Sequence, residues 1–315
     1  MNPTWREPRL EGGLVLELWI PITIGAAFWQ NLRSALQKHL KASLSTTGAT
    51  FARFAYAAPL ATLYAFGLAR LAGSEFPTPN LTFLAYALVG GLAQITATAL
   101  LLHLFSFRNF AVGTTYSKTE TIQTALIGIL LLGDRLRLGA ALAILISLAG
   151  VMAIAVAKTR VSFTSLLRSL TDRTALIGIA SGTFFGISAV SYRGASLALG
   201  DVGFAMRAAF TLACVTWFQT LVMAIYMRLR EPGQLSAVFR SWRVSGWVGF
   251  SGMLASAGWF TAMTIQNAAY VRALGQIELV FTFVASTLFF RERTTPVELL
   301  GILLVISGIL VLVLV

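Results

Sequence analysis

Charged side chains are scarce along this chain. Asp, Glu, Lys and Arg together make up 11% of the 315 residues, whereas hydrophobic residues make up 57%. A soluble globular domain carries about 25% charged residues. Because the apolar residues are spread over the whole length, few segments can face bulk water, and the composition excludes most soluble enzymes. The sequence predicts an integral membrane protein that crosses the bilayer many times.

The residues that build disulfides and metal sites are few as well. The chain has one cysteine, Cys214, and two histidines, His39 and His103. A single cysteine excludes an internal disulfide, and neither histidine has a Cys or Asp at ligand spacing. The sequence also has no Walker A motif or nucleotide fingerprint. We therefore expect no metal, no cofactor and no enzymatic activity.

Acidic residues are half as frequent as basic ones. The chain has 24 Lys and Arg against 12 Asp and Glu, for a net charge of +12. In a soluble domain this balance would suggest a nucleic-acid partner. Here the basic residues lie mostly in short connectors between apolar runs, where lipid headgroups and the positive-inside rule account for them. The expected partners are the lipid bilayer and a small-molecule substrate, with no nucleic acid, and the chain is expected to be a monomer or weak homodimer.

Ten apolar segments are long enough to cross a hydrocarbon core of ~30 Å as helices. They are residues 14–37, 46–69, 81–104, 111–132, 138–157, 175–192, 202–227, 244–265, 269–290 and 297–315. The longest polar connector, 158–174, falls midway along the chain. The prediction is an all-α protein with a five-helix half at 1–157, a linker at 158–174 and a second five-helix half at 175–315. The first span is expected to be retained rather than cleaved as a signal peptide.

The two halves repeat each other in sequence. With a constant offset of 158, five polar or special positions of the first half fall on matching ones in the second. The pairs are Glu120 with Glu278, Thr124 with Thr282, Asp134 with Glu292, Arg135 with Arg293, and Gly150 with Gly308. Because five helices is an odd number, the halves are expected to insert with opposite topology.

These residues resemble the drug/metabolite transporter superfamily, and within it the ten-helix branch with two EamA-type domains. The resemblance covers about residues 14–315 and is carried by three short motifs in each half. They are Tyr116-Ser-Lys-Thr-Glu120, Leu130-Leu-Leu-Gly-Asp134-Arg-Leu and Gly150-Val, then Gln276-Ile-Glu278, Phe289-Phe-Arg-Glu292-Arg and Gly308-Ile. The resemblance implies a secondary transporter with alternating access to a cavity between inverted halves.

Glu120 and Glu278 are the first candidate functional residues, because each lies about ten residues into its expected span. A carboxylate near the bilayer centre normally faces a cavity or a partner. Both a proton or cation site and a structural carboxylate that fixes helix packing fit this placement. Tyr116, one turn before Glu120, can hydrogen-bond it, and Lys118 points away from it. Glu278 lacks such neighbours on its own helix and is the better candidate for proton coupling.

Buried basic residues are expected to favour an anionic substrate. The candidates are Arg33, Arg53, Lys118, Arg207 and Arg272. Guanidinium groups suit carboxylates or phosphates. Arg53 and Arg272 lie near span ends and can instead reach the headgroups, and this is the favoured interpretation for Arg272.

The first span carries a polar stripe at helical spacing that includes Gln30 and Arg33, flanked by Trp29. The matching part of the sixth span holds Phe184 and Phe185. The expected substrate-binding residues are Trp29, Gln30, Arg33, Arg53, Tyr116, Lys118, Glu120, Phe184, Phe185, Arg207, Gln276 and Glu278, with Glu278 and Glu120 also expected in proton coupling.

Small residues at helical spacing are expected to pack helices closely rather than bind a ligand. They are Gly246, Gly249, Gly252 and Ser256 in the eighth span, and Gly301 and Gly308 in the tenth.

The best interpretation is an exporter of small amphipathic metabolites, such as amino acids or organic anions, in a cell inner membrane, coupled to protons or working by exchange. One alternative is a transporter of cationic drugs or quaternary amines, caged by Phe28, Trp29, Phe184 and Phe185. Another is a membrane-embedded enzyme or sensor. The orientation stays open, because the family habit places the termini in the cytoplasm whereas the Lys and Arg of the loops place them outside.

Overall fold

The computed structural model describes residues 18–41, 43–71, 73–104, 107, 110–159, 171–200, 202–288 and 295–314. The described helices are α1 (Trp19–Leu40), α2 (Thr46–Leu71), α3 (Leu81–Leu104), α4 (Phe110–Ser117), α5 (Glu120–Leu132), α6 (Leu138–Thr159), α8 (Arg173–Leu197), α9 (Phe204–Arg230), α10 (Gln234–Arg240), α11 (Trp242–Ile265), α12 (Ala268–Leu274), α13 (Ile277–Leu288) and α14 (Pro296–Leu314). No strand occurs among these residues, which confirms the all-α prediction.

Seven described helices, α2, α3, α6, α8, α9, α11 and α14, are long and apolar enough to cross a membrane. They present large apolar side chains on the outside, such as Leu63 and Trp247, which are 67% and 59% exposed. Lipid tails can cover such side chains, whereas exposing them to water would cost free energy. The polytopic membrane class is confirmed, and the count of ten spans stays a prediction.

The other three predicted spans are either broken into two helices or carry a polar face. The prediction of continuous helices at 111–132 and 269–290 is wrong, because α4 ends at Ser117 before α5 begins at Glu120, and α12 ends at Leu274 before α13 begins at Ile277. The remaining one, α1, is continuous but carries the polar stripe. Broken helices and polar faces are tolerated at membrane depth where they line a cavity.

The two breaks have different local causes. In the first, the Thr119 hydroxyl donates to the carbonyl of Tyr116 at 2.7 Å, a local bond that competes with the helical ladder. In the second, Gly275 lies against the Trp259 ring, and a Cβ atom there would approach the ring to 2.4 Å. Glycine has a low helix propensity and permits this close approach.

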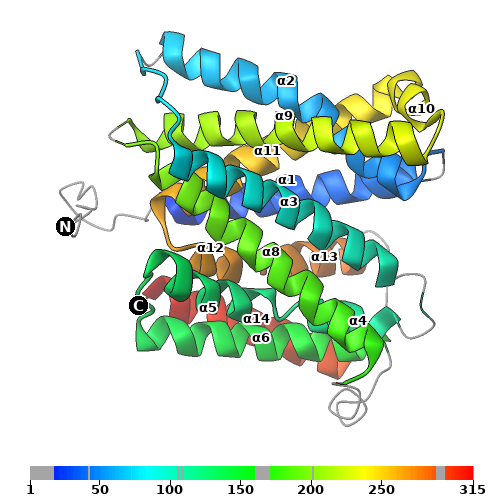
Figure 1. The fold of residues 1–315 in the computed structure, drawn as a ribbon. Helices are drawn as coiled ribbons and strands as arrows, with labels where there is room; N and C mark the ends of the chain where they lie inside the picture. The colour runs from blue at the N-terminus through cyan, green and yellow to red at the C-terminus, as the bar shows by residue number, and fades with distance from the viewer. Residues whose placement is uncertain are drawn as a thin grey trace.

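Helices from before residue 160 pack along helices from after residue 170. The principal pairs are α6 with α14, α3 with α8, α1 with α11 and α2 with α9. Figure 1 shows α2 and α9 at one side of the bundle and α6 and α14 at the other. In the same view α1 begins and α14 ends at the same end of the bundle. The division into two domains is not tested by these contacts and stays a prediction.

Glycines permit the closest helix crossings. A Cβ atom on Gly150 of α6 would lie 2.5 Å from the carbonyl oxygen of Gly301 of α14. One on Gly308 would lie 2.2 Å from the Ser147 hydroxyl. The packing role predicted for Gly301 and Gly308 is therefore confirmed.

In α11 the small-residue ridge is only partly a packing surface. Gly249 lies against Tyr56 of α2, where a Cβ atom would approach to 2.2 Å. A Cβ atom on Gly246 would meet no atom within 4 Å, so the packing role predicted for Gly246 is wrong.

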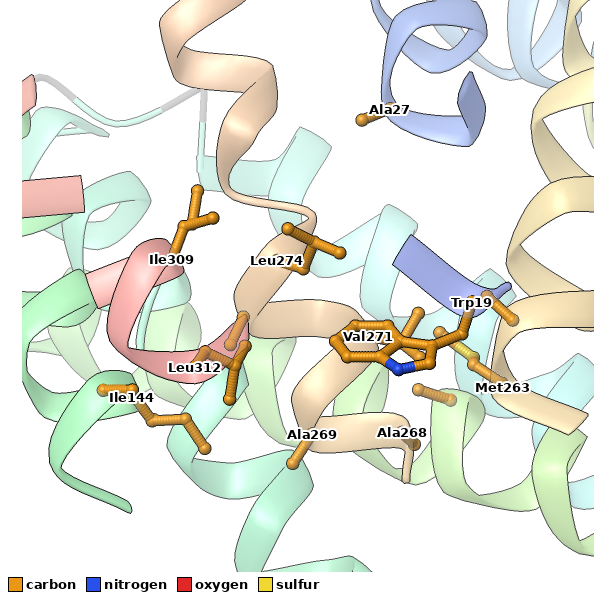
Figure 2. Packing of buried hydrophobic residues seen from close by; sticks show 14 of the residues in the cluster. Trp19, Ala27, Ile144, Met263, Ala268, Ala269, Val271, Leu274, Ile309 and Leu312 are labelled. Carbon is orange, nitrogen blue, oxygen red and sulfur yellow. The ribbon is translucent and has the colours of Figure 1, made fainter. Parts of the chain in front are cut away.

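A hydrophobic cluster joins both breaks to the surrounding helices. Figure 2 shows side chains of α1, α6, α12 and α14 gathered in one cluster, among them Trp19, Ile144, Leu274 and Leu312. Leu274 is 1% exposed and ends α12 immediately before its break. This packing fixes the position of the second break relative to α1, α6 and α14.

Candidate functional site

A cavity of about 630 Å³ opens between the helices and has a polar wall. Its lining comes from α1, α2, α3, α4, α5, α8, α11, α12 and α13 and from both helix breaks. The charged residues among the lining are Arg33, Lys38, Lys41, Arg53, Lys118, Glu120, Arg272 and Glu278. The volume is that of a site for a small molecule.

Most of the predicted site residues meet in this cavity. Those that line it are Gln30, Arg33, Arg53, Lys118, Glu120, Phe185, Gln276 and Glu278. Those that do not line it are Trp29, Tyr116, Phe184 and Arg207. The structure brings the first set together from both sides of residues 160–170.

Packing explains two of the exceptions. Trp29 makes edge contacts with the rings of Phe28 and Phe250, at 5.8 and 6.1 Å between centroids. Tyr116 is buried in a small cluster with Val112 and Ala175. Both residues lie on helices that line the cavity, but their rings pack against apolar neighbours instead of facing it.

Two ion pairs cross between the halves of the chain. Arg272 of α12 pairs with Glu120 of α5, and Lys118 Nζ lies 3.7 Å from Glu278 Oε1. Arg272 also lies 5.5 Å from the Trp259 ring. The interpretation that Arg272 reaches the headgroups is wrong, because its side chain turns inward to a carboxylate. Glu278 has no such neighbour on its own helix, but Lys118 reaches it from the other half.

Both glutamates begin a half-helix. Glu120 is the first residue of α5 and Glu278 lies in the first turn of α13. The helix dipole favours a negative charge at this end. The helix breaks therefore provide a physical reason for carboxylates at these positions, in addition to the two ion pairs.

Glu278 is tied to α1 and α11 by a chain of hydrogen bonds. Gln30 Nε2 donates to Glu278 Oε2 at 2.7 Å, and Trp259 Nε1 donates to Gln30 Oε1 at 3.0 Å. Asn31 Nδ2 donates to the carbonyl oxygen of Glu278 at 3.0 Å. This chain orients the carboxylate toward the cavity and couples three helices to it.

Sequence reasoning predicted Phe185 on the uncharged wall of the cavity but missed Gln94, Tyr192 and Phe260. Tyr192 of α8 stacks on Phe260 of α11 at 4.5 Å between centroids. Its hydroxyl donates to Gln94 Oε1 at 3.1 Å and accepts from Gln219 Nε2 at 3.2 Å, while Gln219 Nε2 also lies 2.8 Å from Gln94 Oε1. Gln94 and Gln219 each lie inside an apolar span, and buried amides require hydrogen-bond partners, so the sequence alone could have predicted a polar contact here.

Arg33 and Arg53 lie together on the charged wall. A Cβ atom on Gly252 would lie 3.2 Å from Arg53 Cγ and 3.3 Å from Arg33 Cδ, so the two stems lie side by side over this glycine. The whole Arg33 residue is 8% exposed, and its Nε atom is buried without a hydrogen-bond partner. The Arg53 guanidinium lies 4.9 Å from the Phe54 ring. Among the described residues, neither guanidinium forms an ion pair.

Asp134, the acidic residue of the turn motif in the first half, lies outside the cavity lining. Asp134 follows Gly133, which ends α5 with φ of +66°. Asp134 Oδ1 lies 3.6 Å from Arg193 Nε, and Arg193 NH1 donates to the carbonyls of Met263 and Gln266. Burial raises the pKa of Asp134, and the Arg193 charge opposes this shift. The contact ties the turn to α8 and α11, outside the cavity.

Part of the second copy of this motif cannot be compared. Phe289, Glu292 and Arg293 lie outside the described residues.

Comparisons with known proteins agree with this architecture. A solved structure described as the crystal structure of a protein is similar to this chain with a TM-score of 0.67 and 17% identity, over 93% of this chain and 94% of that one. At this identity the likeness shows the fold alone. A comparison with curated proteins finds no match. Residues 173–314 match the family model of the EamA-like transporter family, a match that supports placing the chain in the drug/metabolite transporter superfamily.

Proposed function

We propose that this protein is a secondary active transporter that exports small amphipathic metabolites, such as amino acids or organic anions, across a cell inner membrane. The observation that carries the proposal is the cavity of about 630 Å³, which combines unpaired guanidinium groups on one wall with aromatic and amide groups on another. The EamA-like match supports a membrane transporter of this type.

Alternating access provides the mechanism. The two crossed ion pairs and the chain from Gln30 to Glu278 join elements of the two halves at the cavity. Rocking the halves apart on one side requires these contacts to rearrange, while the site stays near the midplane. The short half-helices α4, α5, α12 and α13 are the elements best placed to move, since their backbone ladders are already interrupted.

Proton coupling fits the environment of Glu278. Its carboxylate accepts a hydrogen bond from Gln30 and forms an ion pair with Lys118. A proton on Glu278 would remove the attraction to Lys118 and weaken the closure between the halves. Deprotonation would restore it. Glu120 is the less favourable candidate, because Arg272 pairs with it directly.

The structure favours anions over quaternary amines. Of the four aromatic residues expected to cage a cation, only Phe185 lines the cavity, and Phe28 is 52% exposed. Both carboxylates of the cavity already face basic side chains. A bare organic cation would meet the repulsion of Arg33 and Arg53 without an unoccupied carboxylate.

Transport in reconstituted vesicles tests the proposal. Vesicles loaded with an unlabelled carboxylate or amino acid should accumulate the labelled form by counterflow, and quaternary amines should not compete. Arg33→Lys keeps the charge but loses the planar fork, so it should weaken binding by on the order of 1 to 3 kcal/mol. Arg70→Lys, at the exposed end of α2, is the matched control. Equal binding by Arg33→Lys, or tighter binding of quaternary amines, would contradict the proposal.

A further inference from the structure

We propose that the transported substrate carries two negative charges, and that Arg33 and Arg53 bind both charges as one dianion site. This inference rests on the proposed transport function and narrows its substrate class. The ligand chemistry is a small organic dianion, from either a phosphate monoester or a dicarboxylate.

The geometry places the stems of two arginines at one point of the cavity wall. The stems of Arg33 and Arg53 come from α1 and α2 and meet over Gly252 of α11, where the absence of a side chain leaves room for both. Both residues line the cavity. Two guanidinium forks carried on adjacent stems present several N–H donors that match the oxygens of a phosphate or of two carboxylates.

No acidic residue in the described part of the chain forms an ion pair with either arginine. The field of Glu278 reaches Arg33, but its oxygens face Gln30 and Lys118 at 2.7 and 3.7 Å. Glu120 is paired with Arg272. Among the described lining residues, six are basic and two are acidic, and the two acidic ones are engaged with the other bases. The charge of Arg33 and Arg53 is therefore left for a ligand to balance.

The burial of Arg33 argues for two charges rather than one. A buried guanidinium without a counter-charge is costly, and an unpartnered Nε adds to that cost. A monoanion would balance one of the two arginines and leave the other uncompensated. A dianion balances both. Its organic part can then lie against the stacked rings of Tyr192 and Phe260, which line the same cavity.

Binding to the full-length protein in detergent provides the test. We would measure the affinity for phenyl phosphate and phenyl sulfate at pH 8, and for succinate and succinamate, from the ligand-induced rise in melting temperature. Each pair has similar shape but two negative charges against one. In at least one pair the dianion should bind about tenfold or more tightly, a difference of the size expected for one charge-assisted contact. The pair that shows it identifies the phosphate or the dicarboxylate as the source.

Variants assign the effect to the two arginines. Arg33→Gln and Arg53→Gln should each reduce dianion affinity to that of the monoanion, whereas Arg70→Gln at the exposed end of α2 should leave the difference intact. A measurement on the unmodified protein covers the case in which a variant fails to fold. Because the second ionisation of a phosphate monoester falls near pH ~6, phenyl phosphate affinity should rise between pH 5 and pH 8 while phenyl sulfate affinity stays level.

The outcomes separate this inference from the proposed function. Equal affinity for dianions and monoanions, with counterflow of monoanions intact, would overturn the dianion site and leave anion transport standing. Absence of binding and counterflow for all four probes would overturn both. A dianion preference that survives both Arg→Gln substitutions would place the site elsewhere and overturn the assignment.

Discussion

Arg272 of α12 pairs with Glu120 at the start of α5, and the two side chains are 18% and 20% exposed. Each residue stands beside a helix break, on opposite sides of the long connector. The pair therefore joins the two discontinuous segments in the lining of the cavity. Its burial distinguishes it from the looser contact of Lys118 with Glu278, in which Lys118 is 40% exposed.

Removing one partner of the tighter pair should destabilise the protein. Arg272→Gln leaves the Glu120 carboxylate largely buried without a cation, which should cost about 3 kcal/mol, the lower end for a broken buried pair. Lys118→Gln should cost less than about 1 kcal/mol because solvent screens that contact. Melting temperatures in detergent measure both. The double variant Glu120→Gln with Arg272→Gln should recover much of the loss, and a melting temperature as low as that of Arg272→Gln would contradict the pairing.

The two repeat-related glutamates should differ in their effect on transport. Glu278→Gln should abolish the pH dependence of transport in vesicles, because the group proposed to exchange the proton is lost. Glu120→Gln should lower stability and retain the pH dependence, because Glu120 is engaged in the ion pair with Arg272. Initial rates measured from pH 5 to pH 8 compare the two variants. A full pH dependence in Glu278→Gln would show that the proton is carried elsewhere.

A methyl group at Gly252 should disturb the arginine pair. In Gly252→Ala the new Cβ would lie 3.2 to 3.3 Å from the stems of Arg53 and Arg33, which must then shift. Anion affinity should fall several-fold while the fold persists, because the stems are flexible. Gly246→Ala on the same helix serves as the control, because its new Cβ atom would meet no atom within 4 Å. Anion affinities that fall equally in both variants would argue against a role for Gly252 in placing the arginines.

The crossing of α6 and α14 should depend on glycine. Gly150→Ala would bring a Cβ atom within 2.5 Å of the Gly301 carbonyl oxygen, and backbone cannot yield as a side-chain tip can. We expect a loss of about 1 to 3 kcal/mol, the range for overpacked interiors. Gly67→Ala in α2 meets nothing within 4 Å and should be neutral or slightly stabilising. Melting temperatures that fall equally in both would contradict the close crossing.

Reporters at the two ends of the chain should lie in the same compartment. In Figure 1, α1 begins and α14 ends at the same end of the bundle. Alkaline phosphatase is active outside the inner membrane and green fluorescent protein inside it, so fusions of each at either end report both the agreement and the orientation. Ends in opposite compartments would contradict the ten-span prediction.

The sequence by itself determined the class of the protein and identified the two carboxylates that line its cavity. Low charge and long apolar segments dictate a helical membrane protein, because the bilayer leaves backbone groups no partner other than the chain itself. The constant offset of 158 between Glu120 and Glu278 identified the two carboxylates before any contact was known. A glutamate at mid-span must face protein or a cavity, so this prediction needs no tertiary detail.

Only the tertiary structure decided which polar groups meet. The pairing of Arg272 with Glu120 depends on a helix break and on a contact 152 residues apart in the chain, and no periodicity encodes either. The turn of Trp29 toward Phe250 likewise follows from close packing with α11 rather than from its place on α1. Side-chain direction and partner choice are set by the neighbouring helices that fill the same space, because interiors pack densely enough to leave few alternatives.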